Sequence, residues 1–328
     1  MVRHLVVREE VFPLARVFRI SRGARSEARV VVCEIEEDGF IGRGECVPYP
    51  RYGETVEEVL AAIAAIGPAI AGGLGREGLT RAMRPGAARN AVDCALWDLE
   101  AKRAGRRVWD VAALAPPQPL VTAFTLGVDT PEAMAEAATR ASRKPILKLK
   151  LAGDGLDGAR IAAVRAAAPE ARLIADANEA LTLDELHRLT PTLAEARIDL
   201  LEQPLPADAD EALRGSDWPV PIGADESVHD TATLERLVGL YAVVNLKLDK
   251  TGGLTEALRL RANAERLGLR IMVGCMVGSS LAIAPAHLLA QGCDFVDLDG
   301  PLWLARDREH GLRYEDGVVH PPEAALWG

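Results

Sequence analysis

The chain has 328 residues, of which 49% are hydrophobic, and this suffices for one large α/β barrel or two ordinary domains with a real core. Its formal charge of -10 at pH 7 would repel phosphate backbones and anionic lipid surfaces, which disfavours nucleic acid and membranes as partners. The five cysteines are widely spaced and lack a CxxC pair, so they favour a reducing cytoplasm over disulfides or a zinc site.

The N-terminal third of the chain differs in pattern from the rest. Residues 28–45 alternate apolar and polar side chains, which predicts half-buried strands, and residues 89–105 have the composition of a helix. The charged residues 8–10 interrupt the first apolar stretch, so we expect no secretory signal. We interpret residues 1–115 as an α+β capping domain packed over the mouth of a second domain.

From residue 121 onward, short β-branched runs alternate with longer runs rich in alanine and leucine, as in parallel βα units. Eight such runs occur, at residues 121–128, 146–151, 172–178, 198–204, 220–226, 243–250, 270–276 and 295–300. Their spacing of about 22 to 28 residues is close to the length of a βα unit. The pattern predicts a modified (β/α) TIM-type barrel over residues 116–300.

Helix-start signals between the runs support this assignment. Thr130 can cap a helix that begins at Pro131, and Thr182 with Glu185 forms a capping-box pattern. After the last run, residues 301–328 have a mixed composition. We expect this C-terminal tail to return to the capping domain and form part of it.

Polar side chains cluster at the carboxyl ends of the predicted strands. In a (β/α) barrel these ends converge on one mouth, and residues two apart on a strand share a face. Four strands end in such spaced pairs and two end in one carboxylate: Lys148 and Lys150, Asp176 and Asn178, Glu202, Asp225, Lys247 and Asp249, and Asp297 and Asp299.

Three of these carboxylates and two of these lysines suggest one chemistry. Asp176, Glu202 and Asp225 follow successive strands and form an all-oxygen set of the kind that holds Mg²⁺, and no histidine shares their spacing. Lys150 and Lys247 belong to strands on opposite sides of this carboxylate arc. One lysine could take a proton from a carbon next to a carboxylate while the other returns one to the opposite face, so we predict a 1,1-proton transfer.

The motifs KLK, DAN, LEQP, ADES, NLKLDKTGG, GCM and DLDGP resemble the enolase superfamily in its muconate-lactonizing subgroup. The resemblance covers nearly the whole chain, because SRGARSEARVVVCEIEE, GRGECVPYPRYGE and GAARNAVDCALWDLEAKR are similar to the capping region and first barrel segment of dipeptide epimerases. Enzymes of this superfamily use lysine or histidine bases together with Mg²⁺. The resemblance therefore implies a barrel with a cap and one Mg²⁺ per subunit.

The resemblance also implies a role for each residue that matches a family motif. Lys150 and Lys247 would be the catalytic acid/base pair, and Asp176, Glu202 and Asp225 the metal ligands. The implied substrate contacts are Arg22, Thr125, Lys148, Cys275, Asp297 and Asp299, and the implied supporting residues are Asn178 and Asp249.

Asp297 and Asp299 determine which substrate we expect. In dipeptide epimerases this DxD pair holds the free α-ammonium, and Arg22 would lie near the acidic side chain of the second residue. The resemblance thus implies a small dipeptide as the partner, with L-Ala-D-Glu and L-Ala-L-Glu interconverted during cell-wall peptide metabolism. Members of this family often form homo-oligomers, and the same is expected here.

Two other functions stay open from the sequence. A lyase or cycloisomerase, such as an o-succinylbenzoate synthase or a muconate cycloisomerase, would use the same lysines and metal but would have no need for an ammonium-binding pair. A barrel that only binds a divalent ion and an acidic ligand would need no proton transfer.

Several of these residues also have purely structural interpretations. Any one strand-end carboxylate could be a salt-bridge partner, and the strand-eight pair could form a second cation site or pair with an arginine such as Arg306. By composition alone, Arg22 is a surface arginine. Cys275 is interpreted as a small buried residue without a covalent role, and His229 as a loop histidine.

Overall fold

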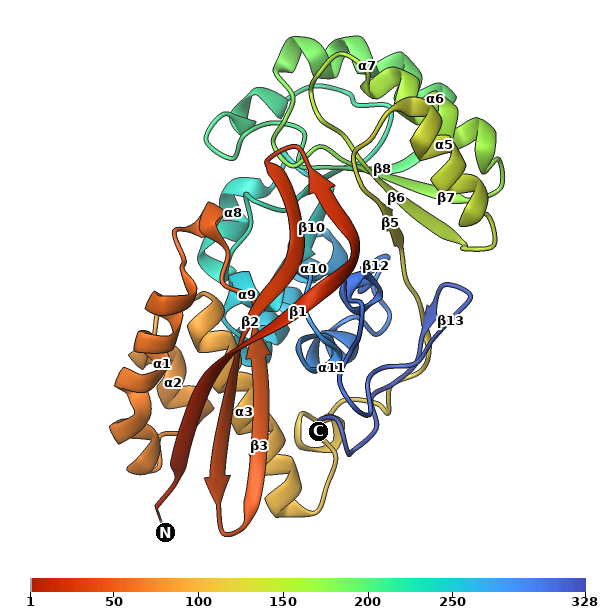
Figure 1. Cartoon of the computed structure of the whole chain (residues 1–328). Helices are drawn as coiled ribbons and strands as arrows, with labels where there is room; N and C mark the ends of the chain where they lie inside the picture. Colours follow the sequence, from red (N-terminus) through yellow and green to blue (C-terminus); the bar gives the residue numbers. More distant parts are fainter. Residues whose placement is uncertain (1) are drawn as a thin grey trace.

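An antiparallel sheet of three strands opens the computed structural model, which describes residues 2–328 (Figure 1). The strands are β1 (His4–Ile20), β2 (Gly23–Glu37) and β3 (Phe40–Cys46), in that order across the sheet. β1 and β2 form a long hairpin whose register shifts between Pro13 and Phe18. The sequence analysis predicted strands only from residue 28 and missed β1, whose apolar alternation this shift interrupts.

Two helices, α1 (Val56–Ala71) and α3 (Ala87–Ala104), pack against the N-terminal sheet, and α2 (Arg76–Ala82) packs against α3. Thr55 and Glu58 form a capping box that starts α1. Gly42 and Gly44 let α3 approach β3 closely, because a Cβ added at Gly44 would lie 2.1 Å from the carbonyl oxygen of Ala91. The sheet and its helices enclose a core of their own.

The second part of the chain is a barrel of eight parallel strands. They are β5 (Phe124–Leu126), β6 (Ile146–Lys150), β7 (Arg172–Asp176), β8 (Ile198–Glu202), β9 (Ile222–Ala224), β10 (Val243–Leu246), β11 (Arg270–Gly274) and β12 (Phe295–Asp297). They are hydrogen-bonded in sequence order. The ring closes where the amide of Ala123 donates to the carbonyl of Val296 over 2.8 Å. Every strand lies within one of the eight predicted runs, so the predicted barrel is confirmed.

Helices cover the outside of the barrel. They are α5 (Pro131–Arg140), α6 (Asp157–Ala167), α7 (Leu183–Glu195), α10 (Leu254–Arg266) and α11 (Ser280–Leu289). The loops contain the single turns α4 (Val108–Val111), α8 (Leu234–Leu237) and α9 (Leu248–Thr251) and the 3₁₀ turns η1 (Pro50–Tyr52), η2 (Asp210–Leu213), η3 (Thr231–Thr233) and η4 (Gly300–Trp303). The predicted caps at Thr130 and Thr182 both form. Within residues 2–328, no helix has the length and apolar character to cross a membrane.

One layer of apolar side chains fills the lower interior of the barrel. It contains one residue from seven of the eight strand positions, all except β9: Ala123, Ile146, Ile174, Leu200, Val243, Met272 and Phe295. Gly223 occupies the equivalent position on β9, where a Cβ would lie 3.1 Å from the side chain of Leu200. Because side chains alternate along a strand, the residue two positions further on each strand faces inward just above this layer.

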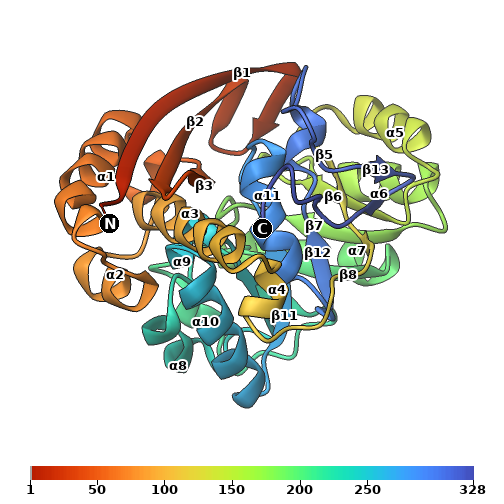
Figure 2. The same ribbon diagram turned by 90° about the horizontal axis from the view of Figure 1, so that it is seen from below.

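Helix α3 joins the N-terminal region to the barrel, between the N-terminal sheet and α10 (Figure 2). The carboxylate of Asp93 accepts hydrogen bonds from the backbone amide (2.9 Å) and the hydroxyl (2.6 Å) of Thr255, and so caps α10. Arg89 donates to the carbonyls of Thr251 (2.6 Å) and Gly252 (3.0 Å) at the end of α9. Both helices that follow β10 are therefore fixed by α3.

The C-terminal tail contacts both parts of the chain. Its strands β13 (Tyr314–Glu315) and β14 (Val318–Val319) pair with each other, and β14 also pairs with β4 (Leu120–Val121), just before the barrel begins. Further on, the indole of Trp327 donates to the carbonyl of Cys94 on α3 over 3.1 Å, and the amide of Gly328 donates to Asp98 over 2.7 Å. The proposed boundaries after residues 115 and 300 stay predictions.

We predict that His287 makes the stability of this fold depend on pH. His287 is fully buried in α11, neither ring nitrogen has a hydrogen-bond partner among residues 2–328, and burial lowers its pKa to about 4. The folded state therefore binds fewer protons than the unfolded state between pH 4 and 6.5. The contribution of neutral His287 to the free energy of unfolding is complete above about pH 6.5 and is lost as the pH falls toward 4.

Urea unfolding at pH 7.5 and pH 5 measures this effect. His287→Leu should remove a pH-dependent loss of about 2 kcal/mol between these two conditions. The control is His4→Leu, an exposed histidine in β1, which should leave the pH dependence as in the unmodified chain. Equal pH dependence in the unmodified chain and His287→Leu would contradict the prediction.

Candidate active site

A ring of polar residues lies directly above the apolar layer of the barrel. Counting two residues along each strand from that layer gives Thr125, Lys148, Asp176, Glu202, Asp225, Asn245, Gly274 and Asp297. Two residues further lie Lys150, Asn178, Lys247 and Asp299. The alternation that builds the barrel core therefore also places the predicted strand-end residues around one mouth.

Lys148 lies at the centre of the first polar ring with its side chain only 1% exposed. Its ammonium nitrogen is 2.6 Å from Glu202, 2.7 Å from Asp297 and 3.0 Å from Asp176. Burial by itself would lower the pKa of Lys148, but these three carboxylates outweigh it and raise the pKa well above its usual value. Lys148 is thus the cation around which the buried carboxylates are arranged.

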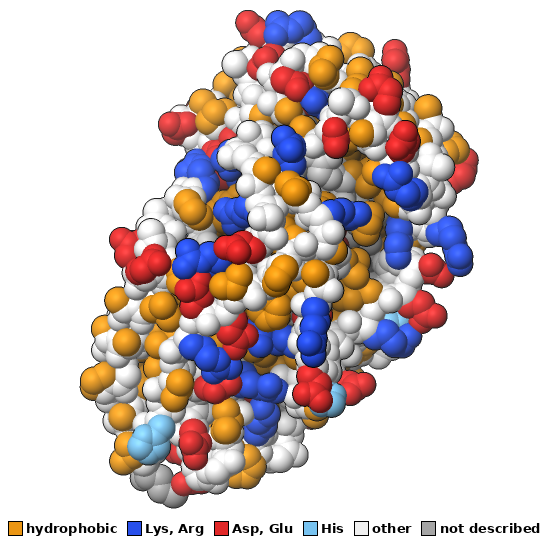
Figure 3. Space-filling view, viewed as in Figure 1, with side chains coloured by type: hydrophobic (Ala, Val, Ile, Leu, Met, Phe, Trp, Pro, Cys, Tyr) orange, Lys and Arg blue, Asp and Glu red, His pale blue; other side chains and the backbone are white. Residues whose placement is uncertain are grey.

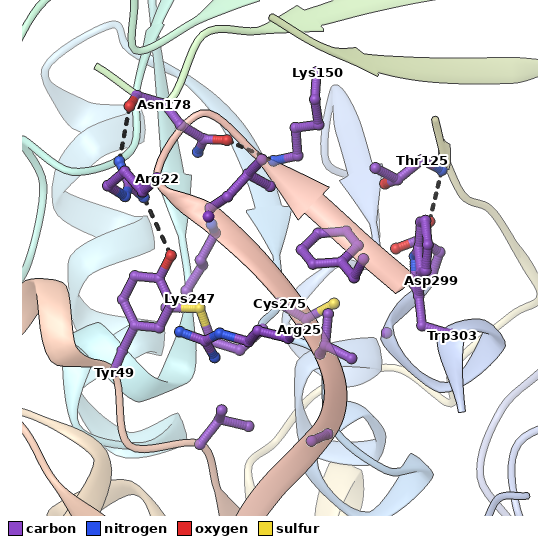
Figure 4. A pocket seen from close by; sticks show the side chains of 18 of the residues that line it. Arg22, Arg25, Tyr49, Thr125, Lys150, Asn178, Lys247, Cys275, Asp299 and Trp303 are labelled. Carbon is purple, nitrogen blue, oxygen red and sulfur yellow. Dashed lines mark hydrogen bonds between the residues drawn. The ribbon is translucent and has the colours of Figure 1, made fainter. Parts of the chain in front are cut away.

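Lys150 and Lys247 face the cavity from opposite sides of the barrel (Figure 4). Their strands, β6 and β10, are four positions apart in a ring of eight. Nζ of Lys150 is 2.5 Å from Asp176 and 3.1 Å from Oδ1 of Asn178. Nζ of Lys247 is 2.6 Å from Asp225. Burial would lower the pKa of Lys247, but Asp225 and Glu202 reverse this and raise it.

The chain uses lysine sparingly, which makes this cluster more informative. It contains six lysines, and four of them, Lys148, Lys150, Lys247 and Lys250, are buried at the barrel mouth. Arginine provides the remaining basic residues. Arginine stays protonated in proteins whereas lysine can lose its proton, so lysine is the type that proton transfer requires.

The predicted metal ligands Asp176, Glu202 and Asp225 are buried side by side at the ends of β7, β8 and β9. Burial and Asp176 raise the pKa of Glu202 to about 7. Burial would also raise the pKa of Asp225, but Lys247 and Lys250 hold it well below its usual range. As the side chains stand in residues 2–328, no group of three or more His, Cys, Asp or Glu residues is close enough together to hold a metal ion.

Chemically, this donor set still suits Mg²⁺. All donors are carboxylate oxygens on rigid strand ends, which Mg²⁺ prefers. Oε2 of Glu202 is buried and makes a close ion pair with Lys148 without hydrogen-bond geometry, so it keeps a free acceptor direction. In the structure, the ammonium groups beside these carboxylates balance the negative charge that a bound divalent cation would balance. The assignment of these three residues as metal ligands stays a prediction, and the chemistry of the donors agrees with it.

Two buried residues beside the carboxylates were missed by the sequence analysis. Asn245 donates to Glu202 over 2.6 Å and lies two residues before Lys247, so strand alternation could have identified it. Lys250 donates to the carboxylate of Asp225 over 2.6 Å and also to its carbonyl. Lys250 lies in the turn α9, and a strand pattern gives no signal for its direction.

Asp297 and Asp299 lie with Thr125 and Cys275 on one wall of the cavity. Oδ2 of Asp297 accepts from Lys148, whereas its buried Oδ1 has no hydrogen-bond partner. Asp299 accepts from the amide of Thr125 over 2.7 Å (Figure 4), and burial together with Asp297 raises its pKa to about 6. Burial also raises the pKa of the Cys275 thiol well above its usual value, so it stays protonated.

The β1–β2 hairpin and the loop after β3 cover the barrel mouth and enclose a cavity of about 180 Å³. Basic and acidic side chains are interspersed along this face of the molecule (Figure 3). Tyr49 and Tyr52 line the cavity from the cap side. Asp249 fixes this side to the barrel, because it accepts from the amide of Val47 over 3.0 Å and from Asn90 over 2.8 Å. It supports the cap and does not line the cavity.

Two arginines from the hairpin tip reach the cavity, and they differ in their contacts. Arg22 donates to Glu226 over 2.7 Å, and it also bonds Glu179 and the carbonyl of Asn178. Arg25 lies over the ring of Tyr49, 5.1 Å from its centroid, and its guanidinium makes no hydrogen bond or ion pair within residues 2–328. Arg25 is thus available to a ligand, whereas Arg22 is already engaged by protein groups.

Two family descriptions match the chain. The description "Mandelate racemase / muconate lactonizing enzyme, N-terminal domain" matches residues 2–112, and "Enolase C-terminal domain-like" matches residues 132–325. The chain belongs to the enolase superfamily. Among its curated relatives are the L-Ala-D/L-Glu epimerase of Escherichia coli, 47% identical over 97% of this chain and 100% of that protein, and the N-acetyl-D-glutamate racemase of a Pseudoalteromonas species, 42% identical over 91% and 95%.

Solved structures of this superfamily are similar over the full length. An enolase family member from Agrobacterium tumefaciens with homology to dipeptide epimerases, solved with sodium and L-Ala-L-Glu, has a TM-score of 0.98 and 53% identity over 99% of this chain and 100% of that one. A dipeptide epimerase from Enterococcus faecalis, complexed with Mg and L-Leu-L-Tyr, has a TM-score of 0.92 and 31% identity over 99% of both chains.

We predict that Lys148 is required for the stability of the barrel mouth. In Lys148→Met, the carboxylates of Asp176, Glu202 and Asp297 lose their central cation, and breaking such buried pairs costs about 3–5 kcal/mol. Urea unfolding in EDTA measures the loss. Lys144→Met, at a half-buried lysine outside the mouth, is the control and should change stability by less than about 1 kcal/mol. Equal midpoints for both variants would contradict the prediction.

Proposed function

We propose that this enolase-superfamily protein is an Mg²⁺-dependent dipeptide epimerase that interconverts L-Ala-D-Glu and L-Ala-L-Glu. One observation carries the proposal: Lys150 and Lys247 face a single cavity from diametrically opposite strands. A carbon held between them can lose a proton from one face and gain one on the other. The relatives named as epimerases, and the neighbour solved with L-Ala-L-Glu, support this reaction class and substrate.

The two lysines would share the work of proton transfer. The lysine on the side of the α-hydrogen must be neutral to accept it, while the other must be protonated to return one. After one turnover the two protonation states are exchanged, so the site is ready for the reverse reaction. In the structure the two lysines contact different carboxylates of the mouth, Asp176 for Lys150 and Asp225 for Lys247.

Asp176, Glu202 and Asp225 would hold Mg²⁺, and the neighbour complexed with Mg and a dipeptide supports this choice. When bound there, Mg²⁺ would supply positive charge next to the substrate carboxylate, where negative charge develops as the α-proton leaves. Lys148 would add a second positive charge at the same carboxylate. Asn245 would keep Glu202 oriented through their 2.6 Å hydrogen bond.

Residues on the cavity wall formed by Asp297 and Asp299, and on the cap side, would bind the two ends of a dipeptide. The unpartnered Oδ1 of Asp297, together with the Asp299 carboxylate, suits the free ammonium of the first residue. Arg25, on the cap side, suits the side-chain carboxylate of the second residue because its guanidinium stacks on Tyr49 but makes no hydrogen bond or ion pair within residues 2–328. For this contact we propose Arg25, whereas the sequence analysis expected Arg22.

The relatives define a competing substrate. N-acetylglutamate has the same α-carbon and carboxylates as the glutamate end of L-Ala-Glu but has no ammonium group, and one relative is named for it. A buried acidic pair is poorly suited to an acetyl group, so Asp297 and Asp299 favour the dipeptide. The same argument disfavours the lyase and cycloisomerase reactions considered from the sequence.

The cellular setting is part of the proposal. L-Ala-Glu dipeptides are components of cell-wall peptides, so the reaction would serve their recycling or breakdown. All five cysteines are free thiols in the structure, which fits a reducing compartment. A cytoplasmic location is therefore the one we propose.

Deuterium incorporation tests the reaction. With Mg²⁺ in D₂O, the protein should exchange the glutamate α-proton of L-Ala-L-Glu for deuterium while L-Ala-D-Glu accumulates. Lys150→Met and Lys247→Met should each abolish epimerisation by at least about 10²-fold, yet each should keep exchange from one epimer only. Lys144→Met should behave like the unmodified chain. An α-proton signal that stays constant with the unmodified protein would refute the epimerase.

The acidic pair makes a separate prediction about substrate and pH. Because the pKa of Asp299 is about 6, the pair should bind an ammonium fully above that pH and lose it below. The KM for L-Ala-L-Glu should rise about tenfold from pH 7 to pH 5, and Asp299→Asn should remove this rise. N-acetyl-L-glutamate, without an ammonium, is the control substrate. If it is turned over faster than the dipeptide, the racemase alternative holds.

A further inference from the structure

Arg22 has an unusual position for a residue at the tip of a hairpin. It lies between the end of β1 and the start of β2, yet its side chain is only 27% exposed. Nη2 donates to Oε1 of Glu226 over 2.7 Å and to the hydroxyl of Tyr49 over 3.2 Å. Nη1 donates to the carbonyl of Asn178 over 2.8 Å and to Glu179 over 3.2 Å. Both terminal nitrogens are therefore fully engaged by protein acceptors.

Glu226 depends on this arginine. Its side chain is 1% exposed, its ion pair within residues 2–328 is with Arg22, and its Oε2 has no hydrogen-bond partner. A buried carboxylate without a paired cation is costly, so the contact holds both partners in place. The same Oε1 also accepts from the side-chain amide of Asn178 over 3.3 Å.

Asn178 connects this contact to a lysine of the site (Figure 4). Asn178 and Glu179 have φ angles of 44° and 68°, a left-handed conformation that non-glycine residues rarely adopt. In this conformation the carbonyl of Asn178 accepts from Arg22 and from Ser21. Its side-chain Oδ1 accepts from Lys150 over 3.1 Å. One residue thus contacts both the hairpin tip and Lys150.

We propose that Arg22 is a positioning residue, which fastens the β1–β2 hairpin over the barrel mouth and, through Glu226 and Asn178, orients Lys150. The proposal rests on the epimerase function and adds to it a dependence of one base on the cap. A substrate carboxylate could reach Arg22 only by displacing Glu226 or Glu179. The substrate-facing arginine of the hairpin remains Arg25.

Hydrogen exchange tests the fastening without any substrate. Amide exchange in residues 18–25 should be faster in Arg22→Met than in the unmodified chain by about tenfold or more, because the contacts that hold the tip are lost. Arg25→Met is the matched control. It removes an arginine of the same hairpin whose guanidinium makes no hydrogen bond, so it should leave this exchange unchanged. Equal exchange in all three proteins would overturn the proposal.

Kinetics test the link to Lys150, using L-Ala-L-Glu and L-Ala-L-Met, whose second side chain is uncharged. Arg22→Met should lower kcat for both by a similar factor and keep their ratio of kcat/KM, whereas Arg25→Met should reduce the preference for the acidic substrate. In D₂O, Arg22→Met should slow α-proton exchange more for the epimer that Lys150 deprotonates than for the other. Arg22→Lys should restore part of the rate.

Two outcomes distinguish the failure of this proposal from the failure of the proposed function. If Arg22→Met loses the preference for L-Ala-L-Glu while its kcat for L-Ala-L-Met stays normal, Arg22 is a substrate ligand and the positioning role is wrong. If the unmodified protein exchanges no dipeptide α-proton, the epimerase function is wrong, and so is the proposal that Arg22 orients Lys150 for proton transfer. The hydrogen-exchange comparison still decides whether Arg22 fastens the hairpin.

Discussion

The rest of the site depends on the pairing of charges that are buried at the barrel mouth. Burying a lone ion is costly, and here Lys148, surrounded by Asp176, Glu202 and Asp297, makes the arrangement tolerable. The apolar layer below fixes the strands, so the polar residues two positions further can point only inward. The same alternation that gives the barrel its core therefore forces acids and ammonium groups into contact, and creates a site where protons can move.

The N-terminal region completes this site and does more than cover it. Helix α3 holds the helices after β10 through Asp93 and Arg89, so the turn that follows Lys247 is fixed from outside the barrel. The β1–β2 hairpin closes the cavity and contributes Arg25 to its lining, whereas Asp297, Asp299 and the lysines come from the barrel. Two relatives of the chain are named for different substrates, one as an L-Ala-D/L-Glu epimerase and the other as an N-acetyl-D-glutamate racemase.

Much of this arrangement could be predicted because it follows from local rules. The eight strands, the caps at Thr130 and Thr182 and the convergence of the strand-end residues require only alternation and the known geometry of a barrel. The remainder depends on contacts far apart in sequence. No pattern shows that Lys250 turns toward Asp225 from a helical turn, or that two arginines three residues apart in one hairpin tip have different partners. The metal set, too, stays a prediction from donor chemistry.

The central claim is that two bases act on opposite faces of one carbon. The isotope content of the first product formed tests it most directly: L-Ala-D-Glu with protium at the glutamate α-carbon is incubated with the protein in D₂O and quenched after a few per cent conversion. Two bases predict that the new L-Ala-L-Glu carries deuterium at that carbon while the remaining substrate still carries protium. Retention of the original protium in the product would show that one base moves the proton across, and would contradict the account.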